Sequence, residues 1–129
     1  MSSHGGVGVE IFYIAHLIKS IVDLGRQYKE LETMQTADGK IYKVDLVTTD
    51  ENGRKIGFQK TAKGDYRIIA DCAGLNSEQL KKQNNFIKQI RQRYSYNKVL
   101  EELKKQGYII SEEEKVQNNT IRLVARKWS

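Results

Sequence analysis

The feature that most constrains this chain is a long helical pattern in its second half. Asn76 and Ser77 provide an N-terminal cap, and the pattern then continues until Gly107 stops it. Neither glycine nor proline interrupts the residues between the cap and Gly107. The pattern therefore predicts helix over residues 77–105, and whatever packs against so long a helix must follow its apolar faces.

Those apolar residues form two stripes on different sides of the helix. At 100° per residue the stripes lie roughly 160° apart, and the change of side occurs at Ser95. A straight helix cannot bury both stripes against one sheet. We therefore expect either a kink or two shorter helices near residues 94–97, or a second stripe that a partner subunit covers. The first stripe is Leu80, Phe86, Ile87, Ile90 and Tyr94, and the second is Tyr96, Val99, Leu100 and Leu103.

The segments on either side of this helix predict short strands and one more helix. Alternating valine and isoleucine over residues 7–11 predict a strand, and helical spacing follows until Gly25. Turn compositions then separate four β-branched or alternating runs, and two apolar runs after Gly107 predict a terminal hairpin. The four runs are 28–33, 41–48, 55–60 and 66–71, and the hairpin runs are 108–110 and 121–128.

This order of elements predicts an α+β fold. We expect a largely antiparallel sheet of about five to seven strands with both helices packed on one face, the second helix being long or kinked. The 129 residues are the length of one domain, so residues 1–129 are expected to form a single domain.

The composition indicates the cellular compartment of the chain. A single cysteine excludes a disulfide framework and is compatible with a reducing compartment. The longest apolar region, residues 7–24, is interrupted by Glu10, His16, Lys19 and Asp23, which predicts neither a membrane span nor a secretory signal. We therefore expect a protein of the cytoplasm that is not secreted and does not insert into membranes.

Several segments from residue 56 onward resemble a known protein family. They are similar to the hypothetical chloroplast reading-frame family, small proteins of unknown function from algal plastids, cyanobacteria and other bacteria. The resemblance implies a fold and a size, and it makes the plastid stroma an alternative to the cytoplasm. It brings no reaction, cofactor or active residue. This chain departs from the family at Asn97, where a histidine is expected, and at Cys72, where members often carry tryptophan. The matching segments are Ile56-Gly57-Phe58, residues 66–71, Gln92-Arg93-Tyr94-Ser95-Tyr96, Gly107 and residues 121–128.

Most of the positive charge lies on the long helical pattern. The chain has a net charge of +6, and residues 77–106 carry eight basic and three acidic side chains. Basic and aromatic residues together can bind nucleic acid by neutralising phosphates and stacking on bases, whereas the alternative is a solvated helix face. The candidate binding residues are Arg91, Arg93, Tyr94, Tyr96 and Lys98.

The other motifs indicate no phosphate-binding, catalytic or metal-binding site. The glycine run 5–8 lacks the lysine and hydroxyl ending of a phosphate-binding loop. Cys72 has no histidine at a spacing that would activate its thiol. The acidic run 112–114 would alternate between the two faces of a strand, so its side chains cannot chelate a metal together. They can instead pair across the hairpin with Arg122, Arg126 and Lys127. We therefore predict no catalytic residue, no metal ligand and no cofactor.

The sequence thus favours a non-enzymatic interaction or accessory subunit that acts through a basic amphipathic helix. Its expected partner is another protein or a second copy of the chain. A nucleic-acid-binding module is the alternative, favoured by the charge of the helix. A small enzyme without a recognisable motif is the third reading, because a pocket built from scattered polar residues leaves no pattern in one sequence.

Overall fold

The computed structural model describes the backbone of residues 10–115 and 121–127 and the side chains of residues 10–108. The predicted strand residues 7–9, the glycine run 5–8 and residues 116–120 between the two hairpin runs lie outside the described residues, as do the side chains of the acidic run 112–114. The elements are α1 (Ile14–Asp23), β1 (Lys29–Gln35), β2 (Ile41–Thr49), β3 (Lys55–Lys60), β4 (Tyr66–Ala70), α2 (Ser77–Lys105), β5 (Tyr108–Lys115) and β6 (Ile121–Lys127).

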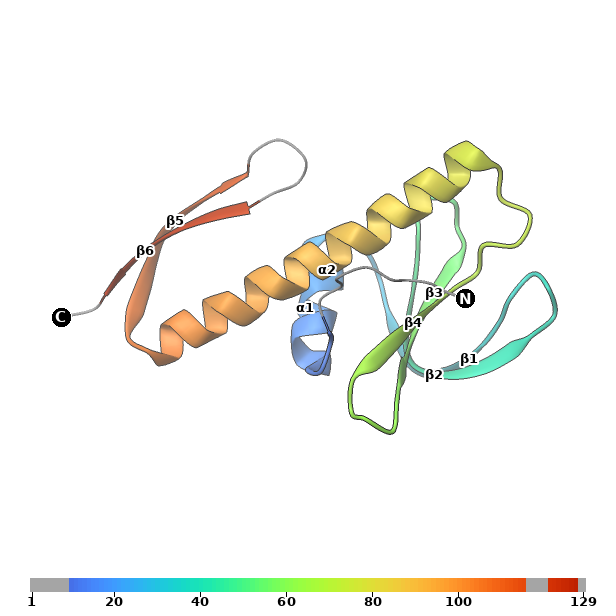
Figure 1. Cartoon of the computed structure of the whole chain (residues 1–129), viewed down its shortest axis with the longest axis horizontal. Helices are drawn as coiled ribbons and strands as arrows, with labels where there is room; N and C mark the ends of the chain where they lie inside the picture. Colours follow the sequence, from blue (N-terminus) through green and yellow to red (C-terminus); the bar gives the residue numbers. More distant parts are fainter. Residues whose placement is uncertain (1–9, 116–120, 128–129) are drawn as a thin grey trace.

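The described strands form two antiparallel sheets (Figure 1). One has four strands in the order β1-β2-β3-β4, and the other is the hairpin β5-β6. The α+β class and the largely antiparallel pairing are confirmed. The expectation of one sheet of about five to seven strands is wrong for the described residues, because α2 carries the last two strands away from the four-stranded sheet.

Both helices pack on the same face of the four-stranded sheet, as predicted. Leu46 and Phe58 are paired across β2 and β3, and their side chains meet the helices in one core. Burial of the large apolar side chains in this core stabilises the fold, and each of them contributes roughly 1.5–3 kcal/mol to the free energy of folding. Its buried members are Ile11, Leu17, Ile21, Leu46, Ile56, Phe58, Phe86, Ile90 and Tyr94.

The other face of the sheet carries a smaller core around Gly57. Gly57 pairs with Val47 on β2, and their neighbours Leu46 and Phe58 face the helices, so this pair faces away from them. Met34 is fully buried on this side. A Cβ on Gly57 would lie 2.5 Å from Met34 Sδ. The far end of the β1–β2 hairpin therefore lies over Gly57, where only a glycine leaves room for it.

The hairpin reaches that position by bending at Leu31 and Asp45. These two residues lie opposite each other but are missing from an otherwise continuous series of β1–β2 pairs. Leu31 has a φ of 54°, a left-handed conformation that costs a leucine roughly 1–2 kcal/mol. The bend brings the hairpin turn back to the sheet, where Ala37 donates its backbone N–H to Asp71 Oδ1 at 2.8 Å.

Helix α2 is continuous over its 29 residues. The Asn76 side chain accepts from Gln79 N, and the Gln79 side chain accepts from Asn76 N, which closes a capping box at its start. Figure 1 shows one unbroken helix whose first half covers the sheet and whose last turns extend beyond it. The expected kink near residues 94–97 is therefore wrong. The chain reverses at Gly107, which has a φ of 86°, and β5 then contacts α2.

Candidate interaction surface

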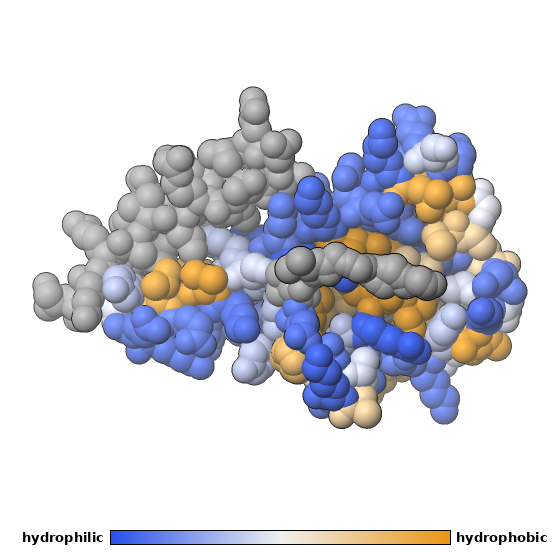
Figure 2. All heavy atoms as spheres, viewed as in Figure 1, coloured by the Kyte–Doolittle hydropathy of each residue, from blue (hydrophilic) through white to orange (hydrophobic). Residues whose placement is uncertain are grey.

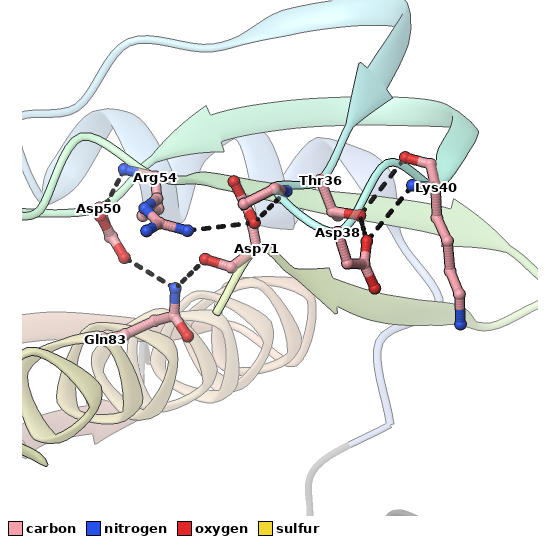
Figure 3. A network of polar contacts seen from close by, with 8 residues as sticks. Thr36, Asp38, Lys40, Asp50, Arg54, Asp71 and Gln83 are labelled. Carbon is pink, nitrogen blue, oxygen red and sulfur yellow. Dashed lines mark hydrogen bonds and ion pairs between the residues drawn. The ribbon is translucent and has the colours of Figure 1, made fainter. Parts of the chain in front are cut away.

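A buried polar network attaches the first half of α2 to the sheet (Figure 3). Gln83 is 2% exposed and donates its side-chain amide to Asp50 Oδ2 at 3.0 Å and to the Asp71 carbonyl at 3.1 Å. Asp50 Oδ1 accepts the backbone N–H groups of Asn52 and Arg54, both at 2.8 Å. Each Asp50 oxygen thus has a protein partner, which is the requirement for burying a carboxylate.

The same network holds the tip of the β1–β2 hairpin. Asp71 Oδ1 accepts from Arg54 Nη1 at 3.2 Å as well as from the Ala37 backbone. Asp71 is 9% exposed, so the pair lies at the edge of the core. Because these carboxylates are occupied by donors of the chain itself, we assign the network to the positioning of α2 and of the hairpin.

Helix α1 crosses α2 near its middle, and Tyr94 fixes the crossing. The Tyr94 side chain is fully buried, and its hydroxyl accepts the backbone N–H groups of Phe12 and Tyr13 at 3.0 and 3.1 Å. Tyr13 is the residue that precedes α1, and its own side chain makes no capping hydrogen bond. Tyr94 therefore satisfies donors just before α1 that would otherwise be left unpaired.

We expect Tyr94→Phe to lower the free energy of unfolding by about 1–2 kcal/mol, because it removes the acceptor for two backbone donors while keeping the ring. Urea unfolding followed by circular dichroism measures the change. Tyr28→Phe is the matched control, since its ring is 38% exposed. Equal stabilities for wild type and Tyr94→Phe would show that the hydroxyl does not hold the start of α1.

The far end of α1 is joined to α2 through Asp23. Asp23 Oδ2 accepts from Arg93 Nε at 2.9 Å and from Asn97 Nδ2 at 3.3 Å, and Lys19 pairs with it from the same helix. Burial opposes the charge of this carboxylate, but the hydrogen bonds from Arg93, Asn97 and Lys19 outweigh it and lower the pKa of Asp23. Asn97 also donates to Ser20 Oγ at 3.1 Å.

The structure separates the five predicted binding residues into two groups. Tyr94 and Tyr96 are buried, at 0% and 7% exposure, and Arg93 lies over the Tyr96 ring at 4.4 Å while it pairs with Asp23. Lys98 is exposed, and Arg91 is half-buried. The sequence pattern placed the two tyrosines on α2 but could not show that α1 would cross there and bury them.

Exposed aromatic surface lies instead at the start of α1, which sequence analysis missed. Tyr13 is 55% exposed and Phe12 is 39% exposed. The Tyr13 ring lies 5.9 Å from Lys98 Nζ and 5.6 Å from the His16 ring. The only signal in the sequence was the pair of aromatic residues at the junction between the predicted strand and helix.

A second exposed surface lies on the last turns of α2, residues 98–105, which we call the projecting segment. Val99 is 47% exposed, whereas Leu100 and Leu103 are half-buried. Figure 2 shows hydrophobic side chains on this end of α2, bordered by hydrophilic ones. The second apolar stripe therefore begins inside the fold at Tyr96 and becomes partly exposed toward the end of the helix.

The histidine, cysteine and acidic side chains of the described residues do not gather into a metal-binding cluster. Among them, no group of three or more histidine, cysteine, aspartate or glutamate residues is arranged to hold a metal ion. His16 packs between the rings of Tyr13 and Tyr94, and Cys72 is an exposed free thiol. No helix in the described part of the chain has the length and apolarity needed to cross a membrane.

Comparison with known proteins identifies relatives without naming an activity. A family model described as "Protein of unknown function (DUF1257)" matches residues 20–124. The chain is also similar to "Uncharacterized protein ycf35" of Cyanophora paradoxa, with 33% identity over 90 residues, which cover 70% of this chain and 68% of the relative. No solved structure matches the chain.

Proposed function

We propose that this chain, which belongs to the DUF1257 family of proteins of unknown function, is a non-enzymatic interaction or accessory subunit. It binds an acidic protein partner through the basic amphipathic helix α2, and the projecting segment forms the contact. The observation that carries this proposal is the position of Val99, Leu100 and Leu103 on a helix end that extends beyond the sheet.

The apolar side chains of the projecting segment supply the centre of such a contact. Val99 exposes about half of its side chain to solvent on the outside of a regular helix. Protein interfaces combine an apolar centre with a polar rim, and an amphipathic helix laid into a groove is a common form of them. Loss of solvent from these side chains would provide the favourable free energy.

The charge of the helix favours an acidic partner. The projecting segment carries three lysines and two glutamates around the apolar centre, and residues 77–106 together carry eight basic and three acidic side chains. The charged residues of the segment are Lys98, Glu101, Glu102, Lys104 and Lys105. Lys105 pairs with Glu101 at 3.7 Å between exposed side chains, a contact that water screens and a partner can replace. An acidic rim on the partner would meet the lysines and accelerate association.

We expect Val99→Glu to weaken partner binding at least tenfold, because it places a charge at the centre of the contact. The full-length chain captures its partner from a nuclease-treated extract, and the captured protein is then purified and titrated calorimetrically against wild type and variants. Val22→Glu is the matched control, since Val22 is 53% exposed on α1.

Equal affinities of wild type and Val99→Glu would contradict the proposal, as would the absence of any captured protein that binds again when purified. Light scattering tests whether the partner is a second copy of the chain. If the mass of the wild type doubles with concentration while Val99→Glu stays monomeric, the partner is a second copy and not an acidic protein.

A further inference from the structure

The start of α1 and the adjacent side of α2 bring an exposed aromatic ring next to basic side chains. Tyr13 is 55% exposed, and Lys98 Nζ lies 5.9 Å from the centre of its ring. That separation is at the outer limit of a cation–π contact, so the ammonium group can leave the ring at little cost. The face of a tyrosine ring is a surface on which any nucleobase can stack.

The backbone that carries this ring is fixed from the interior. The Tyr94 hydroxyl holds the backbone N–H groups of Phe12 and Tyr13, and the His16 ring meets the Tyr13 ring edge-on at 5.6 Å. An exposed ring on a fixed backbone loses less conformational entropy on binding than one on a mobile loop. Tyr13 is therefore better placed for stacking than Tyr94 or Tyr96, which are buried.

Arg91 extends the positive charge along the same side of α2. Arg91 and Lys98 are seven residues apart, which places them on one side of the helix about 10.5 Å apart along its axis. Arg91 Nε is buried and makes no hydrogen bond to the described residues. A phosphate oxygen is a strong acceptor for the guanidinium group of this half-buried side chain.

We propose that this surface binds single-stranded nucleic acid. An unpaired base stacks on Tyr13 with Phe12 beside it, Lys98 leaves the ring to meet a phosphate, and Arg91 meets a phosphate further along the strand. Single strands are favoured over duplexes because stacking on a side chain requires a base that is not already paired. This inference shares Lys98 with the contact proposed for the projecting segment, but it uses none of the apolar side chains Val99, Leu100 and Leu103.

The test uses the full-length chain and two fluorescent probes, a 20-mer of deoxythymidine and a 20-mer of uridine. Fluorescence anisotropy is measured at several salt concentrations between 50 and 200 mM. We expect binding that weakens with salt and Tyr13→Ala to bind at least about tenfold more weakly than wild type, whereas Tyr13→Phe keeps the affinity because the ring remains. Lys98→Gln should reduce the salt slope by about 0.7, the value for one phosphate contact on a single strand.

Matched variants separate this surface from the rest of the molecule. Tyr28→Ala removes another partly exposed tyrosine and should leave the affinity unchanged, as should Val99→Ala, which alters the projecting segment without placing a negative charge beside Lys98. Absence of binding to both probes at 50 mM salt would overturn the proposal, and so would equal affinities of wild type and Tyr13→Ala. Competition by polyglutamate as effective as by unlabelled oligonucleotide would also overturn it and would assign the basic surface to acidic proteins.

Discussion

Asp50→Ala should lower the free energy of unfolding by about 3–5 kcal/mol, because three donors lose their acceptor at a buried position. The donors are the backbone N–H groups of Asn52 and Arg54 and the side-chain amide of Gln83. Asp50 is 1% exposed, so solvent cannot replace it without opening the fold. A loss of this size is a large share of the roughly 5–15 kcal/mol that stabilises a domain.

Urea unfolding monitored by circular dichroism measures this loss. Asp50→Asn should be less harmful, because the amide keeps the shape and one acceptor oxygen. Asp38→Ala is the control, because Asp38 lies in an exposed turn where water can satisfy the groups it leaves. If Asp50→Ala lost less than about 1 kcal/mol, the network would not be what attaches α2 to the sheet.

Gly57→Ala should lower the free energy of unfolding by about 1–3 kcal/mol through overpacking. The added methyl group would lie 2.5 Å from Met34 Sδ and 2.8 Å from Val44 Cγ1. Both neighbours belong to the small core between the β1–β2 hairpin and the sheet, so the hairpin would have to move outward. Thermal and urea unfolding of the variant measure the cost.

Combining this change with Met34→Ala provides the control. Met34→Ala alone should cost about 2–5 kcal/mol, because it empties a fully buried position. In the double variant the new methyl group occupies part of that space, so the combined loss should fall short of the two single losses added together. Strict additivity would show that the hairpin does not rest on Gly57.

The sequence predicted the elements well because their signals are local. The cap at Asn76 and the stop at Gly107 define both ends of α2, and turn compositions separate β1, β2, β3 and β4. The division into two sheets was not predictable in this way. Which strands pair depends on where α2 ends relative to the four-stranded sheet. That position is set by contacts between residues that are far apart in the sequence.

The bend in the first hairpin illustrates the same limit. Leucine rarely takes a left-handed conformation, so nothing in the local sequence marks Leu31 as the bending point. The conformation is held by contacts elsewhere, at Met34 over Gly57 and at Ala37 on Asp71. Only the folded structure places these distant groups together.

The candidate surfaces were predictable in part. The positive charge of α2 and the change of side at Ser95 are properties of one helix, and both could be obtained from its sequence. The burial of Tyr94 and the exposure of Tyr13 depend on the crossing of α1 over α2. That crossing involves Ser20 and Asp23, which carry no recognisable pattern.

The unbroken length of α2 has a consequence for stoichiometry. At 1.5 Å per residue its 29 residues span about 43 Å, more than the roughly 30 Å diameter of a small domain. Val99 and Leu103 lie eight and twelve residues beyond Arg91, about 12 and 18 Å along this axis, whereas Tyr13 lies next to Lys98, the neighbour of Val99. If both proposals hold, the two bound molecules would therefore be adjacent on α2, with Lys98 shared between them.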